Sequence, residues 1–534
     1  MSNGGLDRED LELILGTLKD LGRDLITPER CLEWDEKDEL PEDVIRKMLS
    51  PDVGLHLVFL PEDCGGLGGG AHDIYRVSEE MAKLDLGVAT AFLAIALGSD
   101  PLRVGATGEQ RQRWLGRVAE EGLIVAYGVT EPEAGSNVAA LKTVAEPIMD
   151  GDTVKAYRLN GTKQFISNGS VADLFTILAK TPGGPSFFVA EKGTPGLEAG
   201  RMEVKHGIRS SNTAEVTLED VELPADQLIG LEEGRGLAQA NEVFGFTRLM
   251  VAAFGLGGGE AAIERAIAYS KERKQFGKPL CELRGFTHKL LLPHVVRLEA
   301  ARSYIEEVAA RLDGGEPGLQ TEGAIAKLYA TEAGNAAAEA AIQAHGGYGY
   351  TKEYVVERIK RDVRITTIYE GTSEIQQSII YLYRFKQNLR SKGSFYVEQA
   401  APLRDLGSDV AADLAARTAE ALGHTLTTLH KLKVAKAQNV QFELADRIAE
   451  VEHAMAFCRR AARSGDDGLR AACRLFAAEV AGRLATSGVR LLASAGVEAE
   501  VIEAYRRDIE FEKLLLAAGA RADQDRVVEW MLAE

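Results

Sequence analysis

Apolar residues recur at three- and four-residue spacing through most of the first 122 residues. The pattern is clearest in residues 10–26, 41–49, 71–85 and 107–121. This spacing places the apolar side chains on one face of a helix. We therefore expect an N-terminal α-helical domain over residues 1–122.

The pattern changes to short runs of alternating apolar and polar residues after that. Four runs stand out, residues 155–169, 173–180, 186–192 and 213–224, and turn-forming Asp-Gly and Pro-Gly pairs separate them. Alternation between such turns indicates strands with one buried face. The sequence predicts a middle β domain over residues 123–238.

Long alanine-rich helical patterns return from residue 239, as in residues 261–276 and 322–345. Their length suits a four-helix bundle over residues 239–388. After a polar joint, residues 389–534 again show helical spacing and predict a C-terminal helical extension. The expected fold class is mainly α with a central β domain.

Composition narrows the functional classes. The chain has 62 basic and 81 acidic residues, a net charge of −19, which argues against a nucleic-acid partner. Its five cysteines have no metal-ligand spacing, and we expect no metal site and reduced thiols. The acidic N-terminus does not resemble a signal peptide, and the longest apolar run, residues 86–99, is short for a membrane span. We expect a cytoplasmic protein.

Glycine-rich segments do not form a known nucleotide loop. Residues 64–70 and 255–260 are rich in glycine, but neither completes G-x-G-x-x-G in a βαβ unit, and there is no P-loop. This argues against a nicotinamide dehydrogenase. Since the second segment lies within a helical pattern, close helix packing explains it better.

The segment "IYEGTSEIQ" (residues 368–376) places Glu370 just ahead of a predicted helix. Ser373 and Gln376 have the spacing of a capping box, so we expect the helix to begin near them. For Glu370 alone, the simplest explanation is that acidic residues favour helix N-termini. The rest of the chain has to supply a reason for a catalytic role.

Four further segments could bind a flat or phosphorylated ligand. "YGVTEPEAGSNVAALKT" (127–143) offers amides and hydroxyls in a turn, and "NGTKQFISNG" (160–169) places an aromatic ring near a hydroxyl. "SKERKQFGKPL" (270–280) offers guanidinium and amide donors, and "IQAHGGYGYTKEY" (342–354) has two glycines that allow close backbone approach. Each segment also has a purely structural interpretation when taken singly. In order, these interpretations are a surface loop, a strand with its turn, a basic helix end and a helix C-cap.

Together these segments resemble the acyl-CoA dehydrogenase family. Five separated blocks occur in the family's order: "YGVTEPEAGSN", "FISNG", "HGIRSSNTAEVTLEDVELP", "RKQFG" and "QAHGGYGYTKEYVVERIKRDVRITTIYEGTSEIQ". The resemblance covers roughly residues 10–388. The C-terminal region looks like the extra domain of very-long-chain acyl-CoA dehydrogenases. The family fold of helical domain, β domain and four-helix bundle agrees with the pattern above.

The resemblance implies FAD as cofactor, bound between the β domain and the bundle with help from a neighbouring subunit. The implied cofactor-binding residues are Tyr127, Val129, Thr130, Ser136, Phe165, Ile166, Ser167, Arg273, Gln275, Phe276, Gln343, Gly346, Gly347, Thr372 and Glu374. The implied substrate-binding residues are Ser136, Arg248 and Gly371.

The resemblance also answers why Glu370 stands where it does, since it matches the family's catalytic base. A carboxylate can take the α-hydrogen of a thioester as a proton, while the flavin accepts the β-hydrogen as hydride. Some members carry the base on an earlier helix, but the corresponding position here falls at or near Thr247, which cannot serve.

Four positions depart from the family's usual residues. Asn137 stands where Asp is usual, Phe165 replaces a common Trp, and Arg284 lies near a usual Gln. Gly245 lies where many members have a polar or acidic residue, which bears on the substrate.

The leading hypothesis is an FAD-dependent acyl-CoA dehydrogenase of fatty-acid β-oxidation that passes electrons to an electron-transferring flavoprotein. Small residues at 87–99 favour a medium- to long-chain acyl-CoA, and the C-terminal extension favours a homodimer. One alternative is a dicarboxylyl- or cyclic-acyl-CoA substrate. Another is a family relative without catalysis that acts as an assembly factor.

Overall fold

The computed structural model describes residues 5–517 and 519–533, apart from the side chains of residues 244–246. The chain forms two compact units. The first comprises Met1–Met250 and Leu312–Pro317, and the second Val251–Arg311 and Gly318–Glu534. The long helices α7 (Gly236–Glu272) and α9 (Leu292–Asp313) contribute residues to both.

Six helices of the first unit account for the predicted N-terminal helical pattern. They are α1 (Arg8–Asp24), α2 (Pro28–Lys37), α3 (Glu42–Leu49), α4 (Ala71–Leu84), α5 (Leu86–Gly105) and α6 (Gly108–Glu121). Side chains that accept backbone N–H groups begin several of them, as Thr107 does for α6. Such caps satisfy donors that a helix start leaves unpaired. Asp313, from a distant part of the chain, caps the start of α4. Its carboxylate accepts hydrogen bonds from the Ala71 and His72 N–H groups.

Helix α5 is longer than the apolar run at 86–99 suggested, because it continues through Pro101 to Gly105. By length and composition alone it could cross a membrane, which corrects the expectation that no segment reaches that length. However, 78% of its most apolar window is buried inside the fold. Gly87 packs against Ser210, and Gly98 against Val125, at distances that leave no room for a Cβ atom. The helix therefore behaves as a core helix of the first unit.

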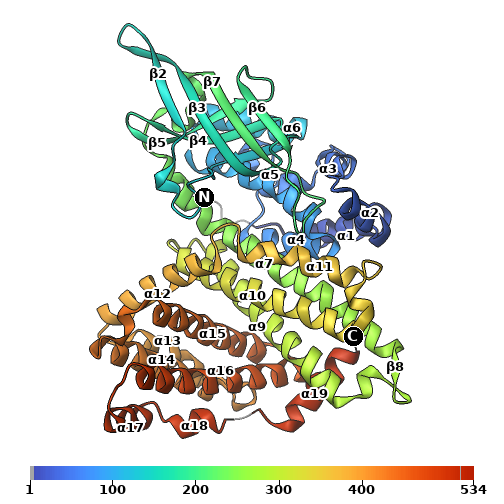
Figure 1. Ribbon diagram of the computed structural model, residues 1–534, viewed down its shortest axis with the longest axis vertical. Helices are drawn as coiled ribbons and strands as arrows, with labels where there is room; N and C mark the ends of the chain where they lie inside the picture. Colours follow the sequence, from blue (N-terminus) through green and yellow to red (C-terminus); the bar gives the residue numbers. More distant parts are fainter. Residues whose placement is uncertain (1–4, 518, 534) are drawn as a thin grey trace. The chain divides into compact units, whose positions relative to one another are not determined.

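The middle region folds as a seven-stranded sheet (Figure 1). Its strands are β1 (Val125–Gly128), β2 (Val144–Asp150), β3 (Thr153–Ser167), β4 (Leu174–Thr181), β5 (Gly184–Glu191), β6 (Leu197–Met202) and β7 (Thr213–Pro224). Their order is β1-β4-β2-β3-β7-β6, with β5 paired to β4. The four runs of alternating residues became β3, β4, β5 and β7, so the predicted strands are confirmed. The register of β3 against β7 shifts between Lys163 and Ile166, which marks a β-bulge.

Among its described residues, the second unit has helices and one short hairpin of β8 (Lys274–Gln275) and β9 (Lys278–Pro279). The predicted bundle corresponds to α7, α9, α10 (Gln320–His345) and α12 (Ser373–Arg390), with the short α8 (Arg284–Phe286) and α11 (Val355–Val363) between them. The expected close packing at residues 255–260 is confirmed. A Cβ atom at Gly255 would lie 2.7 Å from the Thr331 Cα, and one at Gly334 would lie 2.0 Å from the Gly255 carbonyl oxygen. Glycine thus lets the backbones of α7 and α10 touch.

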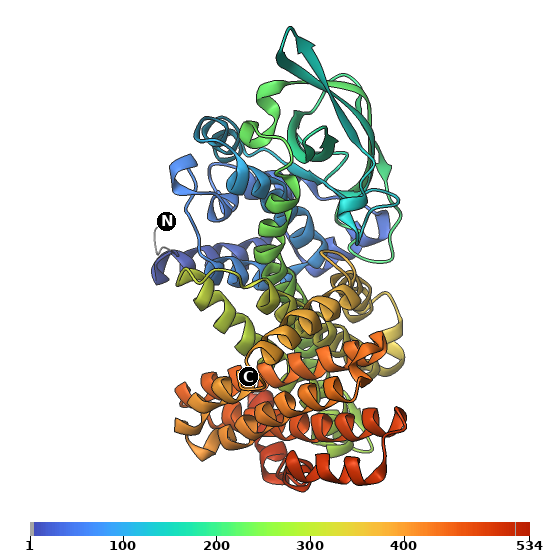
Figure 2. The same cartoon turned by 90° about the vertical axis from the view of Figure 1, so that its left-hand side faces the viewer.

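The C-terminal extension belongs to the second unit. Its helices are α13 (Phe395–Ala400), α14 (Ala412–Lys431), α15 (Gln438–Arg463), α16 (Asp467–Ser494), α17 (Ala499–Asp508), α18 (Phe511–Leu515) and α19 (Arg521–Ala533). Figures 1 and 2 show α14, α15 and α16 side by side in orange and red, and α15 packs against α10 and α12.

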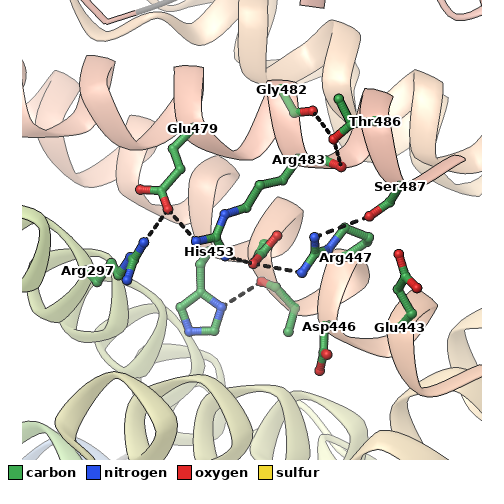
Figure 3. A network of polar contacts seen from close by, with 12 residues as sticks. Arg297, Glu443, Asp446, Arg447, His453, Glu479, Gly482, Arg483, Thr486 and Ser487 are labelled. Atoms are coloured by element: carbon green, nitrogen blue, oxygen red, sulfur yellow. Dashed lines mark hydrogen bonds and ion pairs between the residues drawn. The ribbon is translucent and has the colours of Figure 1, made fainter. Parts of the chain in front are cut away.

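Charged side chains attach the extension to the bundle. Glu479 of α16 accepts a hydrogen bond from Arg297 of α9, and it also pairs with Arg483 at 2.7 Å (Figure 3). Arg483 reaches the buried Glu450 at 2.8 Å, which Arg447 also contacts at 3.0 Å. Burial raises the pKa of Glu450, although both arginines oppose that shift. The extension is therefore held by a connected ionic network as well as by apolar packing.

Candidate active site

Glu370 lies in the loop between a 3-10 turn (Arg364–Thr367) and helix α12, just ahead of the helix as the sequence predicted. Its backbone is left-handed, with φ of 53°, and Gly371 follows at φ of 90°. A non-glycine residue in this region costs of order 1–3 kcal/mol and persists only where its surroundings hold it there. The Glu370 side chain is half-buried. The loop therefore stores strain at the residue that matches the family base.

Two buried side chains hold this loop. The ammonium of Lys327, fully buried on α10, donates to the Tyr369 carbonyl at 2.8 Å and to the Gly371 carbonyl. The Gln376 amide, fully buried on α12, donates to the carbonyls of Glu370 and Gly371, each at 3.0 Å. Three successive carbonyls thus have side-chain donors. Sequence reasoning missed Lys327, although a lysine inside an apolar helical run was a visible signal.

Helix α12 begins at Ser373, close to the predicted position, but the capping-box interpretation was wrong. Thr372 is the N-cap, and its hydroxyl accepts the Ile375 N–H at 3.4 Å. The Ser373 hydroxyl instead donates to Glu332 at 2.6 Å, and the Gln376 amide donates to the Glu370 loop. Glu374 is exposed, and hydrogen bonds from its own N–H and from Thr372 lower its pKa. Glu374 is therefore an ordinary first-turn carboxylate rather than a second buried base.

The paired glycines end helix α10. The helix stops at His345, and Gly346 follows with φ of 62°. A Cβ atom at either Gly346 or Gly347 would meet nothing within 4 Å, so this backbone faces open space. Gln343 lies in the last turn and is exposed. The two glycines therefore form a helix C-cap, and their backbone is also accessible to a ligand.

The "RKQFG" block (residues 273–277) follows the end of α7 and forms strand β8 and the turn toward β9, whereas a helix end was one of the two interpretations of its sequence. Phe276 is at its tip, 93% exposed and left-handed at φ of 53°. Gln275 is also exposed, and its amide bonds to the Lys274 carbonyl. The Arg273 guanidinium lies 5.7 Å from the ring of Tyr348, directly after the paired glycines. The fold thus brings together two motifs about seventy residues apart.

In the first unit, the loop after β1 lies against the bulged end of β3. The Gln164 N–H donates to the Thr130 carbonyl at 2.9 Å. Thr130 and Ser167 are half-buried, whereas Phe165 is 64% exposed with φ of 58°. Val129, Ile166 and the ring of Tyr127 point into the fold, with Tyr127 stacked on Phe187 at 5.8 Å. Thr130, Phe165 and Ser167 therefore form the accessible part of this predicted group.

A buried ion pair fixes the same loop. Lys163 is fully buried and donates to Glu131 at 2.7 Å and to the Val129 carbonyl at 3.3 Å. Glu131 also accepts the Lys142 and Thr143 N–H groups. Burial lowers the pKa of Lys163 to about 8, although Glu131 opposes this. Burial acts against ionisation of Glu131, but the hydrogen bonds, that of Lys163 first, lower its pKa. The pair was absent from the sequence-based site.

The remaining predicted residues are placed as follows. Ser136 is exposed on the loop, next to Asn137. Arg248 is half-buried on α7 beside the buried Thr247. Gly245 lies outside the residues whose side chains are described. Arg284, the departure from a usual Gln, pairs with Asp525 of α19. The extension thus supplies a carboxylate partner for this arginine.

The residues present suit a flavin dinucleotide. Phe165 offers an exposed flat ring beside the hydroxyls of Thr130 and Ser167, which is the chemistry that a planar ring with polar edges requires. In the second unit, the guanidinium of Arg273 lies near the open backbone of Gly346 and Gly347, which suits a pyrophosphate. Each unit therefore carries a group of residues that fits one part of FAD.

Comparison with known proteins identifies the class. The descriptions "Acyl-CoA dehydrogenase, N-terminal domain", "middle domain" and "C-terminal domain" match residues 8–122, 126–221 and 234–382. The chain belongs to the acyl-CoA dehydrogenase family. Members of this family are oxidoreductases that act on the CH–CH group of acyl-CoA, and they bind FAD. The family and its cofactor, expected from the sequence, are confirmed.

Particular relatives extend the comparison. The chain is 37% identical over 366 residues to a short-chain specific acyl-CoA dehydrogenase of Megasphaera elsdenii, covering 67% of this chain and 93% of that protein. It is 35% identical over 377 residues to cyclohexane-1-carbonyl-CoA dehydrogenase of Geobacter metallireducens, covering 70% of this chain and 96% of that protein.

One solved structure also matches the C-terminal extension. It is an acyl-CoA dehydrogenase from Bacillus anthracis complexed with FAD, and the superposition covers 99% of this chain and 96% of that chain with a TM-score of 0.85. At 24% identity this likeness concerns the fold alone. The fold class predicted from the sequence, including the extension, is confirmed.

Proposed function

We propose that this protein is an FAD-dependent dehydrogenase that converts a saturated acyl-CoA to a trans-2-enoyl-CoA, with Glu370 as the base. The observation that carries the proposal is the Glu370 loop. A left-handed glutamate in the family's base position is held by Lys327 and Gln376 through three successive carbonyls. Strain of this kind is typical of functional sites. A carboxylate placed only to favour a helix N-terminus would need no such support.

The reaction follows from the chemistry of the thioester. The thioester carbonyl acidifies the α-hydrogen, and the Glu370 carboxylate takes it as a proton. The released electron pair forms the Cα–Cβ double bond, and the β-hydrogen leaves with its own electron pair. FAD, when bound, supplies the hydride acceptor. The Glu370 N–H can donate to the thioester oxygen, where negative charge develops as the proton leaves. Apolar substrate beside Glu370 would raise its pKa toward the working range.

Glu370→Gln tests the base directly. Glutamine keeps the size of the side chain but cannot accept a proton, so anaerobic flavin reduction by acyl-CoA should slow by at least ~10²–10⁴-fold. FAD content should stay normal. Glu374→Gln is the matched control, one helical turn further on, and we expect it to affect FAD affinity more than proton abstraction. A Glu370→Gln protein that bleaches at the wild-type rate would refute the assignment, and with it the proposed function.

For the substrate, we propose a medium- to long-chain acyl-CoA. The support is the likeness of the C-terminal extension to that of very-long-chain acyl-CoA dehydrogenases, together with the small side chains of α5. Two of these, Gly87 and Gly98, also serve close packing. Two relatives act, by their names, on short-chain and cyclic acyl groups. Rates of flavin reduction with butyryl-, palmitoyl-, glutaryl- and cyclohexane-1-carbonyl-CoA would decide. Faster reduction by any of the others than by palmitoyl-CoA would reject the long-chain proposal.

We further propose a cytoplasmic homodimer that passes its electrons to an electron-transferring flavoprotein, within fatty-acid β-oxidation. The extension covers parts of α9, α10 and α12 that would otherwise be open to a second copy of the chain. Sedimentation at working concentration should give two chains per particle. A stable tetramer would contradict this. Reoxidation of substrate-reduced protein by an added electron-transferring flavoprotein would test the electron acceptor.

A further inference from the structure

Lys327 contacts the peptide that joins Tyr369 to Glu370. Its ammonium donates to the carbonyl oxygen of Tyr369 at 2.8 Å, and the same ammonium donates to the carbonyl of Gly371. These two carbonyls belong to the peptides on either side of the Glu370–Gly371 pair. Gln376 holds the carbonyl between them, that of Glu370, at 3.0 Å. The orientation of all three peptide planes is therefore set by side chains.

Two fixed peptide planes determine the direction of the side chain between them. The plane before Glu370 is held by Lys327 and the plane after it by Gln376. With both planes fixed, φ and ψ of Glu370 are fixed, and so is its Cα–Cβ bond. The left-handed φ of 53° is a conformation that the chain would leave if either hold were lost.

The same contact acts on the Glu370 N–H. In a trans peptide the N–H points away from the carbonyl of the preceding residue, and the described chain has no cis peptide bonds. Lys327 at the Tyr369 oxygen therefore directs the Glu370 N–H to the opposite side of that plane. A cation at the oxygen also polarises the peptide and makes its N–H a stronger donor.

We propose that Lys327 is a positioning residue for the dehydrogenation. It orients the Glu370 carboxylate and strengthens the Glu370 N–H toward the thioester oxygen, and thereby acidifies the bound α-hydrogen. The inference rests on the proposed function, because it requires a thioester at Glu370. Burying an ammonium is costly, and a packing role alone would be served by an apolar side chain of the same length.

The test separates proton abstraction from hydride transfer. A 3-thia-acyl-CoA has sulfur in place of the β-carbon, so it can lose its α-proton but has no β-hydrogen to give up. Its enolate appears as a new long-wavelength absorbance beside oxidised flavin. In Lys327→Met, the apparent pKa of this ionisation should rise by about one unit or more. Flavin reduction by acyl-CoA should slow roughly 10- to 100-fold, with near-normal FAD content.

Matched variants make the result specific. Lys360 also donates to a backbone carbonyl of the bundle, that of Asn335 at 3.2 Å, and Lys360→Met should leave both readouts unchanged. Lys327→Gln, which keeps a neutral donor, should fall between wild type and Lys327→Met. If neither Lys327 variant folds, Gln376→Leu loosens the same loop and should slow flavin reduction, and a wild-type rate there would overturn the proposal.

The outcomes are distinguishable from failure of the proposed function. A folded, FAD-loaded Lys327→Met protein with wild-type ionisation and reduction would overturn the role of Lys327. If Glu370→Gln, measured in parallel, is inactive in that case, the proposed base still stands. If Glu370→Gln reduces normally, the proposed function itself fails.

Discussion

Arg384 and Glu452 form a two-point ion pair inside the second unit, with nitrogen–oxygen distances of 2.6 and 2.9 Å. Arg384 lies on α12, whose first turn follows Glu370, and Glu452 lies on α15 of the C-terminal extension. Both residues are nearly inaccessible to solvent. Tyr304 and Tyr396 also donate to Glu452, and burial raises the pKa of both phenols well above the ordinary value. The extension thus holds the helix that carries the base loop.

We expect Arg384→Met to destabilise the protein by about 3–5 kcal/mol, because Glu452 would be left buried without its cationic partner. The measurement is the free energy of unfolding in urea. Arg417→Met is the control in the same extension, since Arg417 pairs with Asp413 near the surface and should cost at most about 1 kcal/mol. Equal losses in the two variants would contradict the importance of the buried pair.

Gly334→Ala should strongly destabilise the bundle. The new Cβ atom would lie 2.0 Å from the Gly255 carbonyl oxygen, so α7 and α10 would have to separate. We expect a loss of about 3 kcal/mol or more from overpacking. Gly482→Ala, on α16, meets nothing within 4 Å and should instead stabilise by about 0.5–1 kcal/mol through helix propensity. Thermal unfolding of both variants would show whether the opposite signs hold.

Lys163→Met should loosen the loop that carries Thr130. Glu131 would keep its charge in a buried position without its partner, at a cost of roughly 3 kcal/mol, and FAD affinity should fall. Fluorescence titration of FAD and urea unfolding measure the two effects. Lys142→Met is the control, since its pair with Glu133 is exposed. Replacing both members of the buried pair, with Glu131→Leu added, should recover part of the stability. If the double variant recovers no stability, the loss in Lys163→Met does not come from the unpaired charge of Glu131.

We expect the protein to lose stability in acid because of His453. It is fully buried, stacked on Tyr304 at 4.5 Å, and burial lowers its pKa from 6.5 to about 3. Below pH 6.5 the unfolded state therefore binds a proton that the native state does not. The stability contributed by neutral His453 is complete above pH 6.5 and is lost as the pH falls toward 3, by about 2 kcal/mol at pH 5.

His453→Phe keeps an aromatic ring but removes this titration. The variant loses the hydrogen bond to the Ala449 carbonyl, which is a constant cost at every pH. Its free energy of unfolding should therefore fall less steeply than that of the wild type between pH 6.5 and 5. Parallel curves over this range would refute the assignment.

The sequence by itself determined the fold class and the family. Periodicity predicted the helices and four of the strands, because each signal is local and repeats along the chain. The five blocks predicted Glu370 because sequence motifs preserve the order of chemically essential residues. The capping box was a local reading that failed, since Ser373 and Gln376 found better partners in Glu332 and the Glu370 loop.

Only the tertiary structure decided how these residues are held. Neither Lys163 nor Lys327 was predicted from the sequence as a site residue. Yet each is fully buried and fixes a loop that contains predicted site residues. Their partners lie about 30 to 45 residues away. Arg284 gained its partner Asp525 from the far end of the chain. Burial and pairing between distant segments depend on how the chain packs, and packing sets the cost of leaving a charge or a carbonyl unpaired.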